Sequence, residues 1–214
     1  RIPANKYDMK LDFIVTDKNF GNKINNDTRS LALSVASKKM LKVLGANIKA
    51  EAVKKMIVIE GGLGDEKIKS RLTFDRELVD EDIAFIAEHS VIEKSLDKAL
   101  KLEDDVFVRE EVVKIQKEKD QTKVTFKNKK SFMCRAVIFT EILNSEFQDM
   151  YNVKYNFYEY GQAAISATLR HSKNHKGYAF QFFQKNGPLA LLPMNNKRGN
   201  NYSSLVWTEK TDNI

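Results

Sequence analysis

Gly187-Pro188-Leu189-Ala190-Leu191-Leu192-Pro193-Met194 is the stretch that decides the fold, together with Ser204-Leu205-Val206-Trp207-Thr208 further on. Gly-Pro is a turn signal, and the apolar run behind it has the length of a strand rather than that of a helix. The same alternation of short apolar runs and polar turns continues on both sides. From residue 157 onward we therefore predict mainly strands, at residues 163–169, 177–183, 189–193 and 203–208.

The N-terminal part of the chain favours a short strand followed by a helix. Residues 11–16 are a buried strand candidate that ends at Asp17, and the polar residues 18–27 form a loop. Asp27 or Thr28 is then the expected N-cap of a helix. Its apolar stripe contains Leu31, Val35, Met40 and Leu44, and Gly45 is the expected C-terminal cap.

The middle of the chain mixes hairpins with one further helix. Residues 53–60 and 72–74 are expected to be strands joined by a glycine-rich turn at 61–65. Residues 83–87 form another strand, and Ser90 with Glu93 has the spacing of a capping box for the next helix. Further strands are predicted at residues 106–115, 124–126 and 136–139, which completes a mixed α/β (α+β) fold.

Composition bounds the class of protein. The chain has 214 residues, of which 42% are hydrophobic and 30% charged, as in an ordinary globular protein. The single cysteine, Cys134, favours a buried thiol in a reducing cytoplasm. The net charge of +7 comes from scattered lysines without interleaved aromatic residues. We therefore expect no nucleic-acid partner, whereas a weak attraction to anionic membrane surfaces stays open.

Several patterns resemble known kinds of site but lack essential members. The glycines at 61–64 are followed by Asp65-Glu66, which would repel phosphate, so a hairpin turn is the better interpretation. His171 and His175 have the spacing of a helical metal site, but the residues between them predict a loop. No nucleophile and base pair is evident. We predict no metal site and no catalytic side chain.

The C-terminal segments resemble the substrate domain of the flavin-dependent hydroxylases of ubiquinone biosynthesis. Residues 160–165, Tyr-Gly-Gln-Ala-Ala-Ile, and 179–183, Ala-Phe-Gln-Phe-Phe, precede the opening stretch in the same order and spacing as in that family. The resemblance implies hydroxylation of a prenylated phenol, a ubiquinone precursor. The side chains that it implies for substrate binding are Gln162, Pro188, Leu189, Leu191, Pro193 and Trp207.

A weaker resemblance concerns the cofactors, FAD and the reductant NAD(P)H. Residues 27–33, Asp-Thr-Arg-Ser-Leu-Ala-Leu, are similar to a family helix whose arginine, here Arg29, lies near the flavin. Asp17 falls where the family's acidic residue meets the ADP ribose, and Asn144 with Ser145 matches part of the middle motif. These four residues are the implied cofactor contacts.

Departures from the family pattern lead to a specific expectation about activity. The Gly-x-Gly-x-x-Gly segment is missing, Ile142 and Gln148 replace a glycine and an arginine, and the C-terminal flavin region is absent after Ile214. We therefore expect a truncated or split hydroxylase that is inactive on its own. The alternative is a non-catalytic remnant, or a quinone- or lipid-binding partner within a biosynthetic complex.

The expected architecture interleaves a partial flavin domain with a substrate domain. Residues 1–52 and 86–148 would form an incomplete Rossmann-like FAD-binding portion, and 53–85 with 149–214 a mainly antiparallel substrate sheet. A complementary fragment or other ubiquinone-pathway proteins are the expected partners. The expected location is the cytoplasm, at most peripheral to the inner membrane.

Overall fold

A computed structural model describes residues 14–16, 29–61, 67–100, 107–140, 145–197 and 199–214. The chain divides into two compact units, residues 1–3, 24–102 and 160–214 in the first and 4–23 with 103–159 in the second. These boundaries differ from the domains expected above, because residues 29–52 and 86–100 lie with the large sheet. The predicted mixed α/β class is confirmed, with strand predominating.

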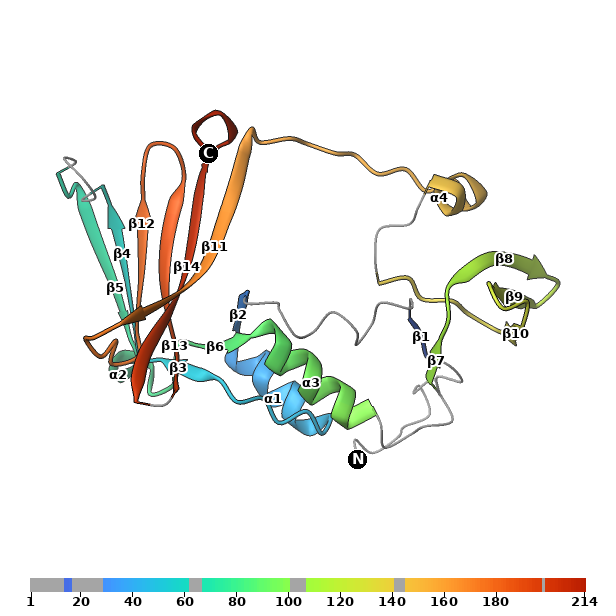
Figure 1. The fold of residues 1–214 in the computed structure, drawn as a ribbon, viewed down its shortest axis with the longest axis horizontal. Coiled ribbons are helices and arrows are strands. Elements are labelled where there is room, and N and C mark those ends of the chain that lie inside the picture. Colours follow the sequence, from blue (N-terminus) through green and yellow to red (C-terminus); the bar gives the residue numbers. More distant parts are fainter. Residues whose placement is uncertain (1–13, 17–28, 62–66, 101–106, 141–144, 198) are drawn as a thin grey trace. The chain divides into compact units, whose positions relative to one another are not determined.

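The first unit is built on a six-stranded sheet of order β11-β14-β13-β12-β4-β5 (Figure 1). Every neighbouring pair is antiparallel except β4 and β12, which run parallel. The strands predicted from the C-terminal sequence are all present. Their bounds are β4 Lys55–Glu60, β5 Ser70–Asp75, β11 Gln162–His171, β12 Tyr178–Phe183, β13 Pro188–Lys197 and β14 Asn200–Lys210.

A three-stranded sheet of order β2-β6-β3 and the helices complete this unit. A core of Val53, Ile86, Ala179 and Met194 joins it to the large sheet, and each of these side chains is at most 3% exposed. On β6, Ala87 packs with the helices α1 and α3. The bounds are β2 Ser30–Leu33, β3 Glu51–Val53, β6 Ala84–Glu88, α1 Val35–Val43, α2 Arg76–Val79, α3 His89–Leu100 and the 3-10 turn η3 Thr211–Asn213.

The second unit contains a small antiparallel meander and one short parallel pair. Its core consists of Ile115, Val124, Phe126 and Phe147, all buried. The elements are β1 Ile14–Thr16 parallel to β7 Phe107–Arg109, the sheet of β8 Val112–Glu118, β9 Gln121–Phe126 and β10 Ser131–Cys134, and the helix α4 Ser145–Tyr151. No helix in the described ranges is long and apolar enough to cross a membrane.

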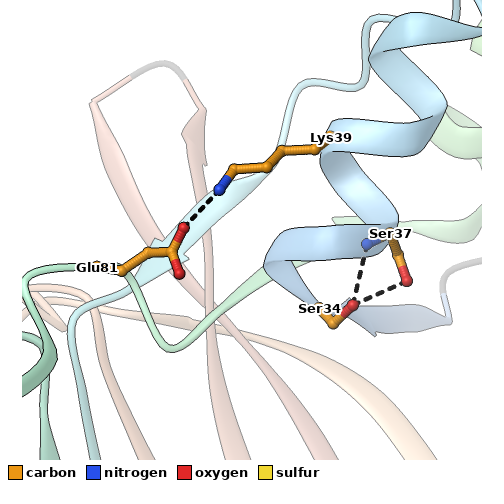
Figure 2. A network of polar contacts seen from close by, with 4 residues as sticks. All are labelled: Ser34, Ser37, Lys39 and Glu81. Atoms are coloured by element: carbon orange, nitrogen blue, oxygen red, sulfur yellow. Dashed lines mark hydrogen bonds and ion pairs between the residues drawn. The ribbon is translucent and has the colours of Figure 1, made fainter.

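The first helix begins later than the sequence predicted. Residues 30–33 form β2 and pair with β6, so Leu31 belongs to a strand rather than to a helical stripe. The cap is Ser34, whose hydroxyl accepts a hydrogen bond from the Ser37 amide at 3.0 Å (Figure 2). The expected caps Asp27 and Thr28 lie outside the described residues.

The predicted end of this helix is confirmed. Gly45 has a φ of +87°, and its amide donates to the Lys42 carbonyl while the Ala46 amide donates to that of Leu41. This pair of bonds is a Schellman motif, in which glycine adopts the left-handed backbone without penalty. On the outer surface of α1, Lys39 forms an ion pair of 2.7 Å with Glu81 (Figure 2).

The predictions for α3 and for the end of the meander were also wrong in detail. Helix α3 starts at His89, before Ser90, because the Arg29 carbonyl already accepts a hydrogen bond from the His89 amide. Residues 136–139 are not a strand. The lysine-rich turn closes within Phe126 to Lys130, with Lys129 at a φ of +67°, so the returning strand β10 starts at Ser131.

Candidate substrate-binding face

The strand register divides the implied substrate contacts between opposite faces of the six-stranded sheet. Leu189 and Leu191 of β13 lie opposite Trp207 and Leu205 of β14, so these side chains share one face. We call this face, with Pro193 and Ser203 in the next row, the Trp207 face. The opposite surface is the Ser204 face.

Two of the implied contacts lie on the Ser204 face. Gln162 pairs with Lys210, and its amide nitrogen donates to the Asn186 carbonyl at 2.8 Å, which ties β11 to the turn before β13. Pro188 opens β13 opposite Phe183. The structure therefore brings Leu189, Leu191, Pro193 and Trp207 together and leaves Gln162 and Pro188 away from them.

Additional apolar side chains on the Trp207 face were not singled out by sequence reasoning. The parallel pairing of β12 with β4 places Phe180 opposite Ile57 and Phe182 opposite Ile59, in the rows of Leu191 and Leu189. On the other side, Ile165 of β11 lies opposite Trp207. The alternation of Tyr178, Phe180 and Phe182 was a signal for a shared face, but the partner strand β4 is far away in sequence.

The indole of Trp207 carries an unsatisfied donor. Its Nε1 atom is buried and has no hydrogen-bond partner among the described residues. A buried donor left unpaired costs about 1–3 kcal/mol, so native structures usually provide an acceptor.

One end of the Trp207 face is polar. His171 Nε2 lies 2.9 Å from the Ser203 hydroxyl, and His171 Nδ1 lies 2.6 Å from the Lys173 carbonyl oxygen. His175 contacts the Met194 carbonyl oxygen and the Gly177 amide. The backbone thus contacts both nitrogens of His175 and one of His171. His171 ends β11, and residues 172–174 form the loop that the sequence predicted.

Lys55 and Asp75 form an ion pair of 2.6 Å in the outer strands of the same face. The side-chain hydrogen bond between them raises the pKa of Lys55 above 10.5 and lowers the pKa of Asp75 below 3.8. The Lys55 ammonium also lies 5.4 Å from the centre of the Tyr178 ring. An ion pair thus lies beside the apolar rows of the Trp207 face.

Asp75→Asn should reveal this pair as a pH-dependent contribution to stability. The asparagine keeps an oxygen for the Glu77 amide, which Asp75 caps at 3.2 Å, but loses the charge. Because the folded-state pKa of Asp75 is depressed, its contribution is present above its ordinary value of 3.8 and is lost as the pH falls through the lower folded value. We expect a lower Tm than wild type at pH 7 and a gap that closes below pH 3.8 in thermal unfolding. A pH-independent gap would contradict this origin.

The implied cofactor residues that the structure describes belong to different units. Arg29 is exposed immediately before β2 in the first unit, and its carbonyl binds the His89 amide. Ser145 starts α4 in the second unit. Asp17 and Asn144 lie outside the described residues. One exposed guanidinium does not make a flavin cradle, so the described residues alone do not fit a bound flavin, and no reaction step through it follows from them.

Comparisons with known proteins show the fold first and then a group of similar sequences. The chain superposes on PqsL of Pseudomonas aeruginosa in complex with 2-aminobenzoylacetate with a TM-score of 0.72 and 12% identity, covering 93% of this chain and 55% of that one. It also superposes on Klebsiella pneumoniae HpxO complexed with FAD and uric acid, with a TM-score of 0.61, 12% identity and coverage of 83% and 46%. The fold is that of the FAD-dependent monooxygenases.

Among proteins of this fold, the chain is similar in sequence to hydroxylases of ubiquinone biosynthesis. Ubiquinone hydroxylase UbiL of Rhodospirillum rubrum is 32% identical over 98 residues, 46% of this chain and 22% of the relative. The mitochondrial ubiquinone biosynthesis monooxygenase COQ6 of Danio rerio is 29% identical over 198 residues, 85% of this chain and 39% of the relative. The resemblance to the ubiquinone-biosynthesis hydroxylases is thereby confirmed, and the chain spans well under half the length of these relatives. No family model matches the chain.

Proposed function

We propose that this chain supplies the substrate-covering sheet of a flavin-dependent hydroxylase that acts on a prenylated phenol in ubiquinone biosynthesis. The observation that carries the proposal is the Trp207 face, where Leu189, Leu191 and Trp207 form a continuous apolar surface with an unsatisfied indole donor. An apolar surface with one polar group suits a ligand with a prenyl chain and a ring oxygen.

The described side chains bind and orient in this proposal, and they perform no chemistry. Leu189, Leu191 and Phe182 would contact the prenyl chain and exclude water, since burial of such side chains stabilises a complex by about 25 cal/mol per Å². Trp207 Nε1 would donate to the phenol oxygen. The cofactor would be FAD with NAD(P)H as reductant, and FAD supplies the oxygen chemistry when it is bound.

Binding of a short prenylated phenol tests the proposed face directly. Trp207 is the only tryptophan in the sequence, so its emission reports on this face alone. We expect 2-geranylphenol to change that emission saturably, and Leu191→Asp to weaken binding at least tenfold, the equivalent of about 1.4 kcal/mol. Geranylbenzene, which lacks the oxygen, should bind severalfold more weakly because it leaves Nε1 unpaired.

A matched control places the same charge on the other side of the sheet. Ser166 is exposed and belongs to the Ser204 face through its pairing with Val206, so Ser166→Asp should bind 2-geranylphenol as wild type does. Equal affinities for wild type and Leu191→Asp, or for the phenol and geranylbenzene, would remove the Trp207 face from the proposal.

Flavin titration separates the hydroxylase from a second candidate, a non-catalytic quinone- or lipid-binding protein. The apolar Trp207 face suits both candidates. We expect FAD to bind this chain with a Kd weaker than about 1 mM, because a 1 mM Kd already needs about 4 kcal/mol and one charge-assisted hydrogen bond from Arg29 supplies roughly 1.5–3 kcal/mol.

The titration is followed by flavin fluorescence with Arg29→Ala as the variant. Saturation at micromolar FAD that is lost in Arg29→Ala would show a complete flavin site in this chain and would exclude the non-catalytic candidate. Micromolar binding that is unchanged in Arg29→Ala would contradict the role given to this arginine.

A further inference from the structure

A hollow on the Ser204 face lies at the end of β4, on the side of the sheet opposite to Leu189, Leu191 and Trp207. It has a volume of about 560 Å³ and is lined by Val58, Leu72 and Phe183, with Glu60, Lys69 and Lys185 at its polar side. Its outer wall is β5, which forms a free edge of the six-stranded sheet (Figure 1). Its volume falls within the range of small-molecule sites.

The floor of the hollow continues as an apolar track along the sheet. Leu72 lies opposite Val58, and Phe74 lies opposite Met56 in the row beyond. The exposed fractions are 56% for Leu72, 47% for Phe74 and 49% for Phe183, which are high values for large apolar side chains that share one face. From the row of Ser70 to that of Phe74 the track is about 13 Å long, at 3.3 Å per residue.

Among the described residues that line the hollow, two lysines accompany one carboxylate. Glu60 accepts a hydrogen bond from the Ser70 hydroxyl at 3.1 Å and lies 3.8 Å from the Lys69 ammonium. Lys185, in the turn after β12, forms no ion pair within the described part of the chain. Among these described residues, the positive charge of Lys69 and Lys185 together therefore exceeds the negative charge of Glu60.

We propose that this hollow binds one single-chain amphiphile with an anionic head, of the fatty-acid class. The carboxylate pairs with Lys185 and Lys69, and the alkyl chain lies along Leu72 and Phe74, where it covers apolar surface that is now exposed. The charges of Lys69 and Lys185 favour an anionic head group over a cationic one. The short length of the track favours a single alkyl chain over an extended lipid surface. The site lies on the face opposite to Trp207, so it is independent of the proposed function.

Titration with 11-(dansylamino)undecanoic acid tests this site, with its uncharged 11-(dansylamino)undecanol analogue in parallel. We expect a saturable blue shift of dansyl emission that lauric acid reverses. Leu72→Ser with Phe183→Ser should weaken both probes at least tenfold. Lys185→Glu should weaken the carboxylate probe severalfold and leave the alcohol unchanged, because only the head-group charge differs.

Matched controls place the same substitutions elsewhere. Leu78 is 80% exposed and lies outside the hollow, and Lys114 is an exposed lysine of the second unit, so Leu78→Ser and Lys114→Glu should bind both probes as wild type does. Far-UV circular dichroism confirms that each variant is folded. Equal binding by wild type and the Leu72/Phe183 variant, or retention on phosphatidylglycerol vesicles without binding of the monomeric probe, would overturn the proposal.

Discussion

Gly187→Ala should lower the free energy of unfolding of the first unit by about 3 kcal/mol or more, the sum of backbone strain and overpacking. Gly187 is buried with a φ of +155°, and an added Cβ would lie 2.5 Å from the Thr208 carbonyl oxygen and 2.9 Å from its carbon. Both atoms belong to the backbone of the neighbouring strand β14, which cannot move without losing its pairing with β11 and β13. Glycine is therefore required at position 187, because the backbone there lies very close to the backbone of Thr208.

Urea unfolding followed through the emission of Trp207 measures this effect, since Trp207 lies one residue before Thr208. The matched control is Gly161→Ala, where the φ is +63° but no atom lies within 4 Å of the added Cβ. That variant should cost only about 1 kcal/mol, the usual cost of a left-handed backbone in a residue other than glycine. Equal losses in the two variants would show that the contact with Thr208 is unimportant.

Phe126→Ala should cost the second unit about 3–5 kcal/mol, the usual range for a buried phenylalanine. Phe126 is 1% exposed, packs with Ile115, Val124 and Phe147, and makes an edge-to-face contact with Phe132 at 5.5 Å between ring centres. The unit is small, so one large cavity removes a considerable part of its core. We expect amide hydrogen exchange in β8, β9 and β10 to accelerate by at least a hundredfold, the equivalent of about 3 kcal/mol.

The control for this prediction is Phe157→Ala, because Phe157 is 75% exposed. That substitution should change the free energy of unfolding by less than about 0.5 kcal/mol. Unchanged exchange in the meander of Phe126→Ala would mean that the cluster around Phe126 does not hold these strands together.

Local sequence signals predicted the elements whose causes are local. The hairpin of β4 and β5 and the strands from β11 to β14 follow from short apolar runs between turn residues, and Gly45 ends α1 because its cap needs a left-handed residue. The starts of α1 and α3 could not be predicted in this way. At the start of α1, residues 30–33 pair with the distant strand β6, and at the start of α3 the His89 amide donates to the distant Arg29 carbonyl.

The candidate site shows the same division. The stretch at 187–194 and Trp207 indicated the strands and the resemblance to the ubiquinone-biosynthesis hydroxylases. Both inferences rest on particular residue types in a fixed order. Which side chains share a face could not be predicted, since Gln162 and Pro188 belong to the same motifs as Leu189 and Trp207 but lie on the opposite surface. Ile57 and Ile59 joined the face only through the parallel pairing of β4 with β12.

The sequence by itself thus determined which segments are strands, where the turns between them fall and which family the chain resembles, because each depends on residues within a few positions of one another. The tertiary structure decided the faces of the sheet, the starts of the helices and the placement of the hollow beside Leu72. These depend on the register between strands distant in the chain, and a shift of that register by one residue exchanges the faces of the sheet.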